Sequence, residues 1–243
     1  MKMITFARRC AKEILRDPIN LAFGLGFPLV LLLLLSAIQA SIPVSMFEID
    51  TLTPGLTVFG LSFMTLFSAT LVAKDRETAF LQRLYTTPLT GRDFILGYML
   101  PLLPIALCQT AVCYLAAIPL GLTVSSHVID ALIGIIPMAV FNIALGLLCG
   151  SLLGVKQVGG ICGALLTNLS AWLSGVWFDL KLVGGFFAKA ANILPFFHAV
   201  ELEKALFSGN FALAGTHFWP VLLYSAWITV AAVLCFLRQM QKQ

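Results

Sequence analysis

Charged residues are scarce in this sequence. They make up 11% of its 243 residues, whereas 60% are hydrophobic and the mean hydropathy is +0.98. An average soluble domain is about one quarter charged and about half apolar. The composition therefore excludes an ordinary soluble domain.

The residue patterns of common enzymes and metal sites are also missing. No glycine is followed by lysine, so the phosphate loop G-x-x-x-x-G-K-[ST] is absent, and neither H-E-x-x-H nor G-x-S-x-G occurs. The six cysteines form no C-x-x-C pair, and the three histidines stand apart from any cluster of metal ligands. We therefore expect no enzyme active site, and no metal or cofactor bound by this chain.

Long uncharged runs dominate what is present. A bilayer core about 30 Å thick requires roughly 20 mostly apolar residues per helix, and lipid leaves backbone groups no partners outside a helix or closed barrel. The runs are continuous rather than alternating, which favours helices. We predict an all-α, polytopic membrane protein with one transmembrane domain over residues 1–243. Its six expected spans lie near residues 20–40, 55–73, 95–121, 131–152, 158–178 and 218–237.

Basic residues predict the orientation of these spans. Six spans place both termini, the 74–93 segment and the turn at Lys156 on one side, with twelve Lys and Arg residues against three on the other. Basic residues favour the cytoplasmic side. We expect both termini in the cytoplasm, and because this asymmetry accounts for the net charge of +4, we expect no nucleic-acid partner.

Residues 1–17 have an amphipathic pattern. Apolar residues recur at helical spacing on one face, and Arg8, Arg9, Lys12 and Arg16 occupy the other. This pattern is typical of a helix lying on the membrane surface, and the alternative is a solvated basic tail. Asp17-Pro18 predicts an N-cap and first position for the next helix. The apolar run that follows is too long for a usual signal peptide, so we expect it to be retained.

The predicted spans contain no acidic or basic residue at central positions. Ion-coupled transporters usually carry such residues at mid-membrane, although backbone carbonyls can replace them. The pattern suggests that the driving energy enters elsewhere, and an ion-coupled secondary transporter remains the alternative.

The segment of residues 74–93, KDRETAFLQRLYTTPLTGRD, is the densest polar stretch. Phe80, Leu81 and Leu84 fall on one face of a predicted short helix that Pro88 ends. Charged loops are ordinarily just solvated, but three large apolar residues at helical spacing must pack against headgroups, neighbouring helix ends or a partner.

Two stretches resemble the permease subunits of type-2 ATP-binding-cassette (ABC) exporters. In residues 53–100 the similarity lies in Pro54-Gly55, in Asp75-Arg76-Glu77, in Leu84 and in the sequence TPLT at residues 87–90; in NILPFFHAVELEKALFSGNF, residues 192–211, it lies in an Asn-x-x-Pro-aromatic-x-His-x-x-Glu pattern. Thr78, Ala79 and Tyr98 depart from the family's usual residues, which leaves the shape of the cytoplasmic helix open.

The resemblance implies a division of labour. Two permease chains, either two copies of this one or this chain and a paralogous one, form an export pathway in the bacterial cytoplasmic membrane. Two separate ATPase subunits hold ATP and Mg, and the segment after the second span docks on them. The residues that this assigns to coupling are Asp75, Arg76, Glu77, Phe80, Leu81, Arg83 and Leu84.

Residues 179–217 are too interrupted by charge to span, yet GGFF and ILPFF are too apolar for a free loop. In the family this part forms two short re-entrant helices at the outer end of the pathway, and the alternative is an ordinary extracellular loop. The outer-gate residues implied are Pro195, Phe196, Phe197, His198 and Glu201.

The fifth predicted span has a stripe of small residues that could line the pathway or the two-fold axis. Small residues allow close helix approach in lipid, and Asn168 beside them would be costly facing lipid. The alternative is packing within the chain, which we assign instead to Gly146, Gly150 and Gly154 of the fourth span. The pathway or axis residues are Gly160, Gly163, Thr167, Asn168, Ser170 and Ser174.

Substrate class is the least constrained prediction. The four tryptophans gather toward the fifth and sixth predicted spans, where membrane-interface anchoring explains several of them. We expect a lipophilic drug-like or peptide substrate. A glycolipid or polysaccharide is the alternative within the same family.

Overall fold

The computed structural model describes residues 2–42, 47–78, 89–178 and 184–241, and every regular element in these ranges is helical. The predicted all-α class is therefore confirmed. The helices are α1 (Lys2–Leu15), α2 (Pro18–Leu21), α3 (Phe27–Gln39), α4 (Ile49–Gly60), α5 (Ser62–Glu77), α7 (Gly91–Met99), α8 (Leu102–Ala117), α9 (His127–Gly134), α10 (Ile136–Leu152), α11 (Val155–Val158), α12 (Thr167–Leu173), α14 (Gly185–Ile193), α15 (Pro195–Phe207) and α16 (Phe211–Gln241).

Five helical stretches in the described ranges are long and apolar enough to cross a membrane. They are Pro18–Gln39, Ile49–Glu77, Gly91–Leu120, His127–Leu152 and Phe211–Met240. The predicted fifth span, residues 158–178, is not among them. There, α11 passes through a π-helical stretch, Gly159–Leu166, into α12. The chain is thus a multi-pass helical membrane protein, while the count of six spans stays a prediction.

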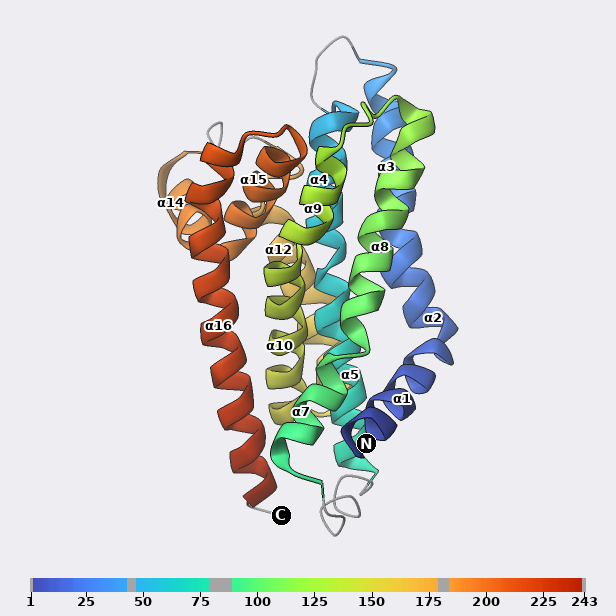
Figure 1. Ribbon diagram of the computed structural model, residues 1–243, viewed down its shortest axis with the longest axis vertical. Coiled ribbons are helices and arrows are strands. Elements are labelled where there is room, and N and C mark those ends of the chain that lie inside the picture. Colours follow the sequence, from blue (N-terminus) through green and yellow to red (C-terminus); the bar gives the residue numbers. More distant parts are fainter. Residues whose placement is uncertain (1, 43–46, 79–88, 179–183, 242–243) are drawn as a thin grey trace.

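Different helices gather at the two ends of the bundle. Figure 1 shows both termini at one end, beside α1, the end of α5 and the start of α7. At the opposite end, α14 and α15 pack beside the start of α9 and of α16. The bundle therefore separates the predicted coupling segment from the predicted outer segment by its full length.

Helix α1 is amphipathic, and much of its apolar face lies against protein. Phe6, Cys10 and Ile14 are buried, and the Phe6 ring packs edge-on against Phe94 and Tyr98 of α7. Ile4 and Leu15 are 54% and 64% exposed, and the place of α1 at the membrane surface stays a prediction. The predicted cap after α1 is confirmed, since the Asp17 carboxylate accepts a hydrogen bond from the Asn20 backbone N–H at 3.2 Å.

Helices α5 and α10 form the closest helix pair at the centre of the bundle. Gly146 and Gly150 of α10 face α5 so closely that an added Cβ would lie 2.4 Å from the Thr65 carbonyl oxygen or 2.6 Å from that of Ala69. The Thr65 hydroxyl also donates to the Asn142 carbonyl oxygen at 3.0 Å. The predicted internal packing of these two glycines is confirmed.

Candidate functional site

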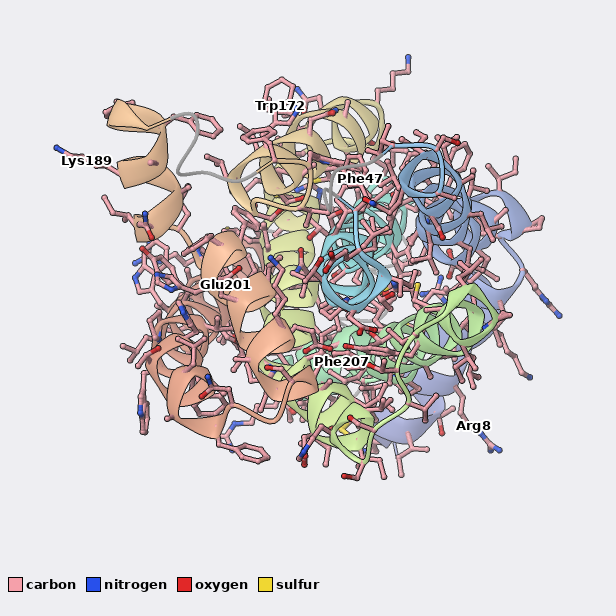
Figure 2. The ribbon with its side chains drawn as sticks, turned by 90° about the horizontal axis from the view of Figure 1, so that it is seen from above. Arg8, Phe47, Trp172, Lys189, Glu201 and Phe207 are labelled. Carbon is pink, nitrogen blue, oxygen red and sulfur yellow. The ribbon has the colours of Figure 1, made fainter. Side chains whose placement is uncertain are left out.

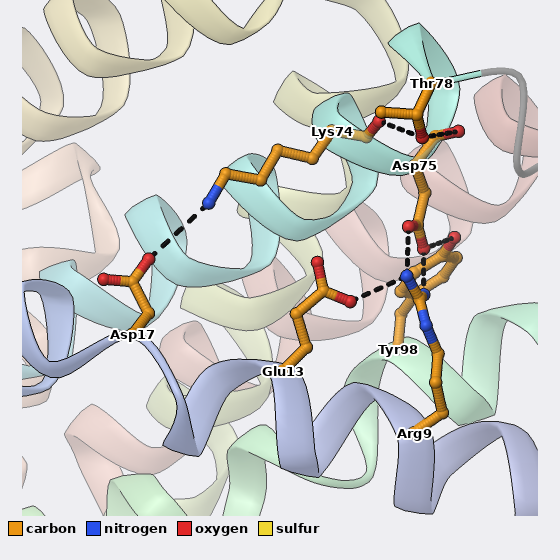
Figure 3. Close-up of polar contacts among 7 residues, drawn as sticks. All are labelled: Arg9, Glu13, Asp17, Lys74, Asp75, Thr78 and Tyr98. Atoms are coloured by element: carbon orange, nitrogen blue, oxygen red, sulfur yellow. Dashed lines mark hydrogen bonds and ion pairs between the residues drawn. The ribbon is translucent and has the colours of Figure 1, made fainter.

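The first residue of the predicted coupling triplet, Asp75, sits in a buried polar node at the end of α5. Its carboxylate accepts two hydrogen bonds from the Arg9 guanidinium, the one from Nη2 at 2.6 Å, and one from the Tyr98 hydroxyl at 2.8 Å. Figure 3 shows these contacts together with the Arg9–Glu13 and Lys74–Asp17 ion pairs. The node therefore joins α1, α5 and α7 through one carboxylate.

The electrostatics of this node follow from its burial. Asp75 is 2% exposed. Burial alone lowers the pKa of Arg9, but the hydrogen bond and charge of Asp75 outweigh it and raise that pKa above its ordinary value. The guanidinium is charged throughout the physiological range, so the node is a true ion pair.

The next two residues of the triplet hold the turn between α10 and α11. Arg76 donates to the carbonyl oxygens of Ser151 and Leu153, the latter at 2.7 Å. The Glu77 carboxylate accepts from the Val155 backbone N–H at 2.8 Å. These contacts satisfy carbonyls at the C-terminus of α10 and an amide at the N-terminus of α11, where a helix has no partner of its own.

The triplet thus lies at the end of the bundle where the coupling segment begins, and its side chains bind within the chain. The other predicted coupling residues, Phe80, Leu81, Arg83 and Leu84, lie outside the described residues. The role of the whole set in coupling stays a prediction.

An aromatic hollow is the second feature of the site. It measures about 460 Å³ and lies between the first two spans and the π-helical stretch with α12. Phe27, Phe59, Phe63, Trp172 and Trp177 supply aromatic wall. Trp172 is 53% exposed within the single chain, and Figure 2 shows it at the edge of the bundle.

The predicted small-residue stripe divides between this hollow and the interior. Gly163, Thr167 and Asn168 line the hollow. Ser170 and Ser174 are buried, and their hydroxyls donate to carbonyls of their own helix at 2.8 and 2.9 Å. An added Cβ on Gly160 would meet nothing within 4 Å. The stripe therefore faces the hollow with some of its residues and the protein interior with others. Its predicted place at a two-fold axis between two permease chains stays a prediction.

The amide of Asn168 explains how a polar residue can stand at this hollow. Its Nδ2 donates to the Ala164 carbonyl oxygen at 2.8 Å, while the side chain as a whole is exposed. Its Oδ1 has no hydrogen-bond partner among the residues that the structure describes. The hollow is thus an apolar surface with one amide acceptor available.

The predicted outer-gate residues begin α15. Pro195 occupies its first turn, and Phe196 is buried edge-on against Phe141 of α10. The Nδ1 atoms of His198 and His217 lie 2.9 Å apart, and His198 Nε2 faces the Asn192 carbonyl oxygen at 2.8 Å. Because a carbonyl only accepts, Nε2 carries the His198 proton and Nδ1 accepts from His217.

Two predicted gate residues remain: Phe197 packs edge-on against the His217 ring, and Glu201 makes an ion pair with Lys204 at 3.0 Å. Their helix α15 packs on α16, α4 and α9 at the end opposite the termini (Figure 1). These residues therefore form a packed cap, and its gating role stays a prediction.

Sequence reasoning missed Glu203, two residues further along α15. It is 1% exposed and accepts a hydrogen bond at 3.0 Å from the hydroxyl of Tyr114 on α8. Burial raises the pKa of Glu203 to about 8, although the Tyr114 hydrogen bond opposes this rise. An acidic residue inside the apolar pattern AVELEKALF was the available signal, but its partner is 89 residues away.

The raised pKa predicts a pH-dependent stability for this cap. Between the ordinary value of 4.5 and about 8, folded Glu203 keeps a proton that the unfolded chain releases, so stability falls as pH rises through this window. We expect Glu203→Gln, which keeps an acceptor for Tyr114, to remove this slope from the unfolding temperature. Tryptophan fluorescence in detergent micelles at pH values below and above the window measures it.

Glu201→Gln is the matched control, because this side chain lies on the same helix and is partly exposed. Both variants keep the His198–His217 pair, but Glu201→Gln also removes a negative charge that interacts with His217, so each variant is compared with the parent chain as well. An unchanged slope in Glu203→Gln would contradict the assignment.

Metal chemistry finds no support in the described ranges, where no group of three or more His, Cys, Asp or Glu side chains could hold an ion. The features at hand are a polar node at one end, an aromatic hollow between spans and a packed cap at the other end. Together they fit a membrane transport component.

Comparison with known families supports the same conclusion. Residues 1–207 match the family described as ABC-2 type transporter. Comparison with curated proteins gives no match. The family match covers most of the chain, so the chain belongs to the ABC-2 type transporter family. With its long apolar helices, it is the multi-pass membrane component of such a transporter.

Proposed function

We propose that this chain is the permease subunit of an ABC exporter for a lipophilic drug-like or peptide substrate. A second copy, or a paralogous permease, completes the export pathway, and two separate ATPase subunits that hold ATP and Mg drive it. The chain crosses the bacterial cytoplasmic membrane six times, with the Val155–Leu173 stretch as the fifth span and both termini in the cytoplasm. The presence of both termini at one end of the bundle supports this topology (Figure 1).

The aromatic hollow is the observation that carries the substrate class. Ligand sites are mostly apolar and aromatic, with few polar groups that orient the ligand. This hollow has six aromatic side chains, and its polar side chains are Thr167 and Asn168 alone. A polysaccharide would bring many hydroxyls and find few partners here, so the lining favours a lipophilic substrate.

The contacts of the coupling triplet support the proposal that separate ATPase subunits drive transport. Asp75, Arg76 and Glu77 tie α5 to α1, α7, α10 and α11, so a conformational change in the segment that follows α5 is passed to four other helices. The sequence also has no phosphate loop of its own. Nucleotide binding on a partner that docks at this end accounts for both observations.

Transport by the reconstituted complex tests this function. We expect vesicles with the permease and its ATPase to accumulate a hydrophobic dye only with ATP, and Trp172→Ala to weaken half-saturation about tenfold, which corresponds to about 1.4 kcal/mol. Trp227→Ala is the matched control, because Trp227 is 68% exposed on α16 and does not line the hollow.

Three results would contradict the proposal. The permease alone could hydrolyse ATP, a proton or sodium gradient alone could drive transport, or both tryptophan variants could transport the dye equally well. The second result is the one that a secondary transporter predicts.

A further inference from the structure

A second cavity lies apart from the aromatic hollow, between α1, α2 and α5. It measures about 1050 Å³ and is open to the surroundings near the end that holds both termini. Its lining combines a basic edge from α1 with apolar side chains of α5, including Phe67 and Leu71. The cavity shares Arg9 with the coupling node, and none of its described lining residues lines the aromatic hollow.

The basic edge carries charge that the chain itself leaves unneutralised. Glu13 and Asp17, which also line the cavity, pair with Arg9 at 2.7 Å and with Lys74 at 3.6 Å. Three further cations line it, two on α1 and one directly after it, and they form no ion pair with any described residue. These are Arg8, Lys12 and Arg16.

The spacing of these three cations makes them repel one another. Arg8 and Lys12 stand four residues apart on α1, where like charges destabilise a helix, and Arg16 directly follows the last residue of that helix. Figure 2 shows Arg8 extending outward from the bundle. An anion at this edge would relieve the repulsion.

The membrane location narrows the kind of anion. Phe67 and Leu71 line the cavity on a membrane-spanning helix, and because they are only 3% and 4% exposed they form its floor. A zwitterionic lipid would leave the cations unneutralised. Basic pockets beside membrane-spanning helices are suited to anionic lipid headgroups.

Insertion of α1 into the membrane by its apolar face does not account for the basic edge. Phe6 and Cys10 on that face are buried against protein, whereas Ile4 and Leu15 are 54% and 64% exposed. The basic side of α1, next to the cavity, is a separate exposed surface.

We propose that this cavity is a binding site for an acidic phospholipid of the adjacent leaflet. Its phosphate lies against Arg8, Lys12 and Arg16, and its acyl chains extend into the bilayer beside α5. The lipid then bridges α1 and α5 beside the node. The inference rests on the membrane location of the chain and not on what it transports.

Native mass spectrometry of the delipidated full chain tests this site. The protein is titrated in detergent with phosphatidylglycerol, with phosphatidylcholine, or with phosphatidylglycerol in the presence of glycerol phosphate. We expect one phosphatidylglycerol to bind in preference to phosphatidylcholine. The triple variant Arg8→Gln, Lys12→Gln, Arg16→Gln should weaken its binding at least about tenfold, since each basic residue near an anionic surface contributes.

The matched control removes three other exposed cations at the same end of the molecule. It is the triple variant Arg92→Gln, Lys156→Gln, Arg238→Gln, none of which lines the cavity. Lys12→Glu is the single-site check, since one reversed charge on an exposed position leaves the fold intact. We expect full binding by the control and loss by Lys12→Glu.

Each remaining outcome overturns the proposal. If both triple variants lose phosphatidylglycerol binding equally, the lipid is attracted to any basic surface of the protein and not to this cavity. Equal binding of the two lipids means that the basic edge does not select charge. Displacement by glycerol phosphate at equal concentration means that a soluble phosphate is the ligand.

Discussion

Asp75→Ala is expected to destabilise the folded chain by about 1–3 kcal/mol, the usual cost of leaving a buried hydrogen-bonding group without its partner. The carboxylate is 2% exposed and is the acceptor for both Arg9 and Tyr98. Alanine leaves the buried Tyr98 hydroxyl without that acceptor, while Arg9, whose side chain is 34% exposed, keeps its ion pair with Glu13. Thermal unfolding in detergent micelles, followed by tryptophan fluorescence, measures the loss.

Asp130→Ala is the control for this prediction, because Asp130 is 41% exposed and pairs only with His127 at a helix start. A pair of that kind contributes about 0–1 kcal/mol. Asp75→Asn, which keeps an acceptor for Tyr98, should fall between the two. Combining it with Arg9→Gln should cost less than the sum of the single variants, because the two side chains interact directly. Similar unfolding temperatures for Asp75→Ala and Asp130→Ala would refute the role of the node.

Gly146→Ala is expected to cost about 1–3 kcal/mol, as overpacking of a close-packed interior does. The added Cβ would lie 2.4 Å from the Thr65 carbonyl oxygen and 2.6 Å from the Ser68 Cβ. A backbone oxygen in a helix cannot move alone, so α5 and α10 must separate. Gly150→Ala should behave alike, and the same unfolding measurement in micelles compares both with the parent chain.

Gly215→Ala is the matched control, since Gly215 lies in α16 and its added Cβ would meet nothing within 4 Å. Alanine there gains up to about 1 kcal/mol in helix propensity. Equal effects of Gly146→Ala and Gly215→Ala would contradict the close approach of α10 to α5. Gly160→Ala should resemble the control in the single chain, and any loss there requires a contact from outside it.

Helix positions were the most predictable part of the fold. Lipid leaves backbone groups without partners, so long uncharged runs must be helical wherever they span. Five of the six predicted spans correspond to helices of sufficient length and apolarity. The exception, residues 158–178, is less apolar, because glycine, serine, threonine and asparagine take up many of its positions.

The polar positions were less predictable, because an isolated sequence does not show which side chains meet. The charges of Asp75, Arg76 and Glu77 predicted a segment exposed to a partner, yet all three bind within the chain. The partner of Asp75 lies 66 residues away on a helix that sequence reasoning placed on the membrane surface. Likewise, nothing near Glu203 in sequence indicates its contact with Tyr114.

The two small-residue stripes show where sequence information ends. Gly146 and Gly160 both belong to patterns typical of close helix approach, and the sequence alone determined only that each lies on a helix suited to such contact. The tertiary structure decided between them by placing α5 against Gly146 and leaving Gly160 open. The physical reason is that helix formation depends on local backbone hydrogen bonds and hydropathy, whereas helix contacts depend on how separate segments fill space together.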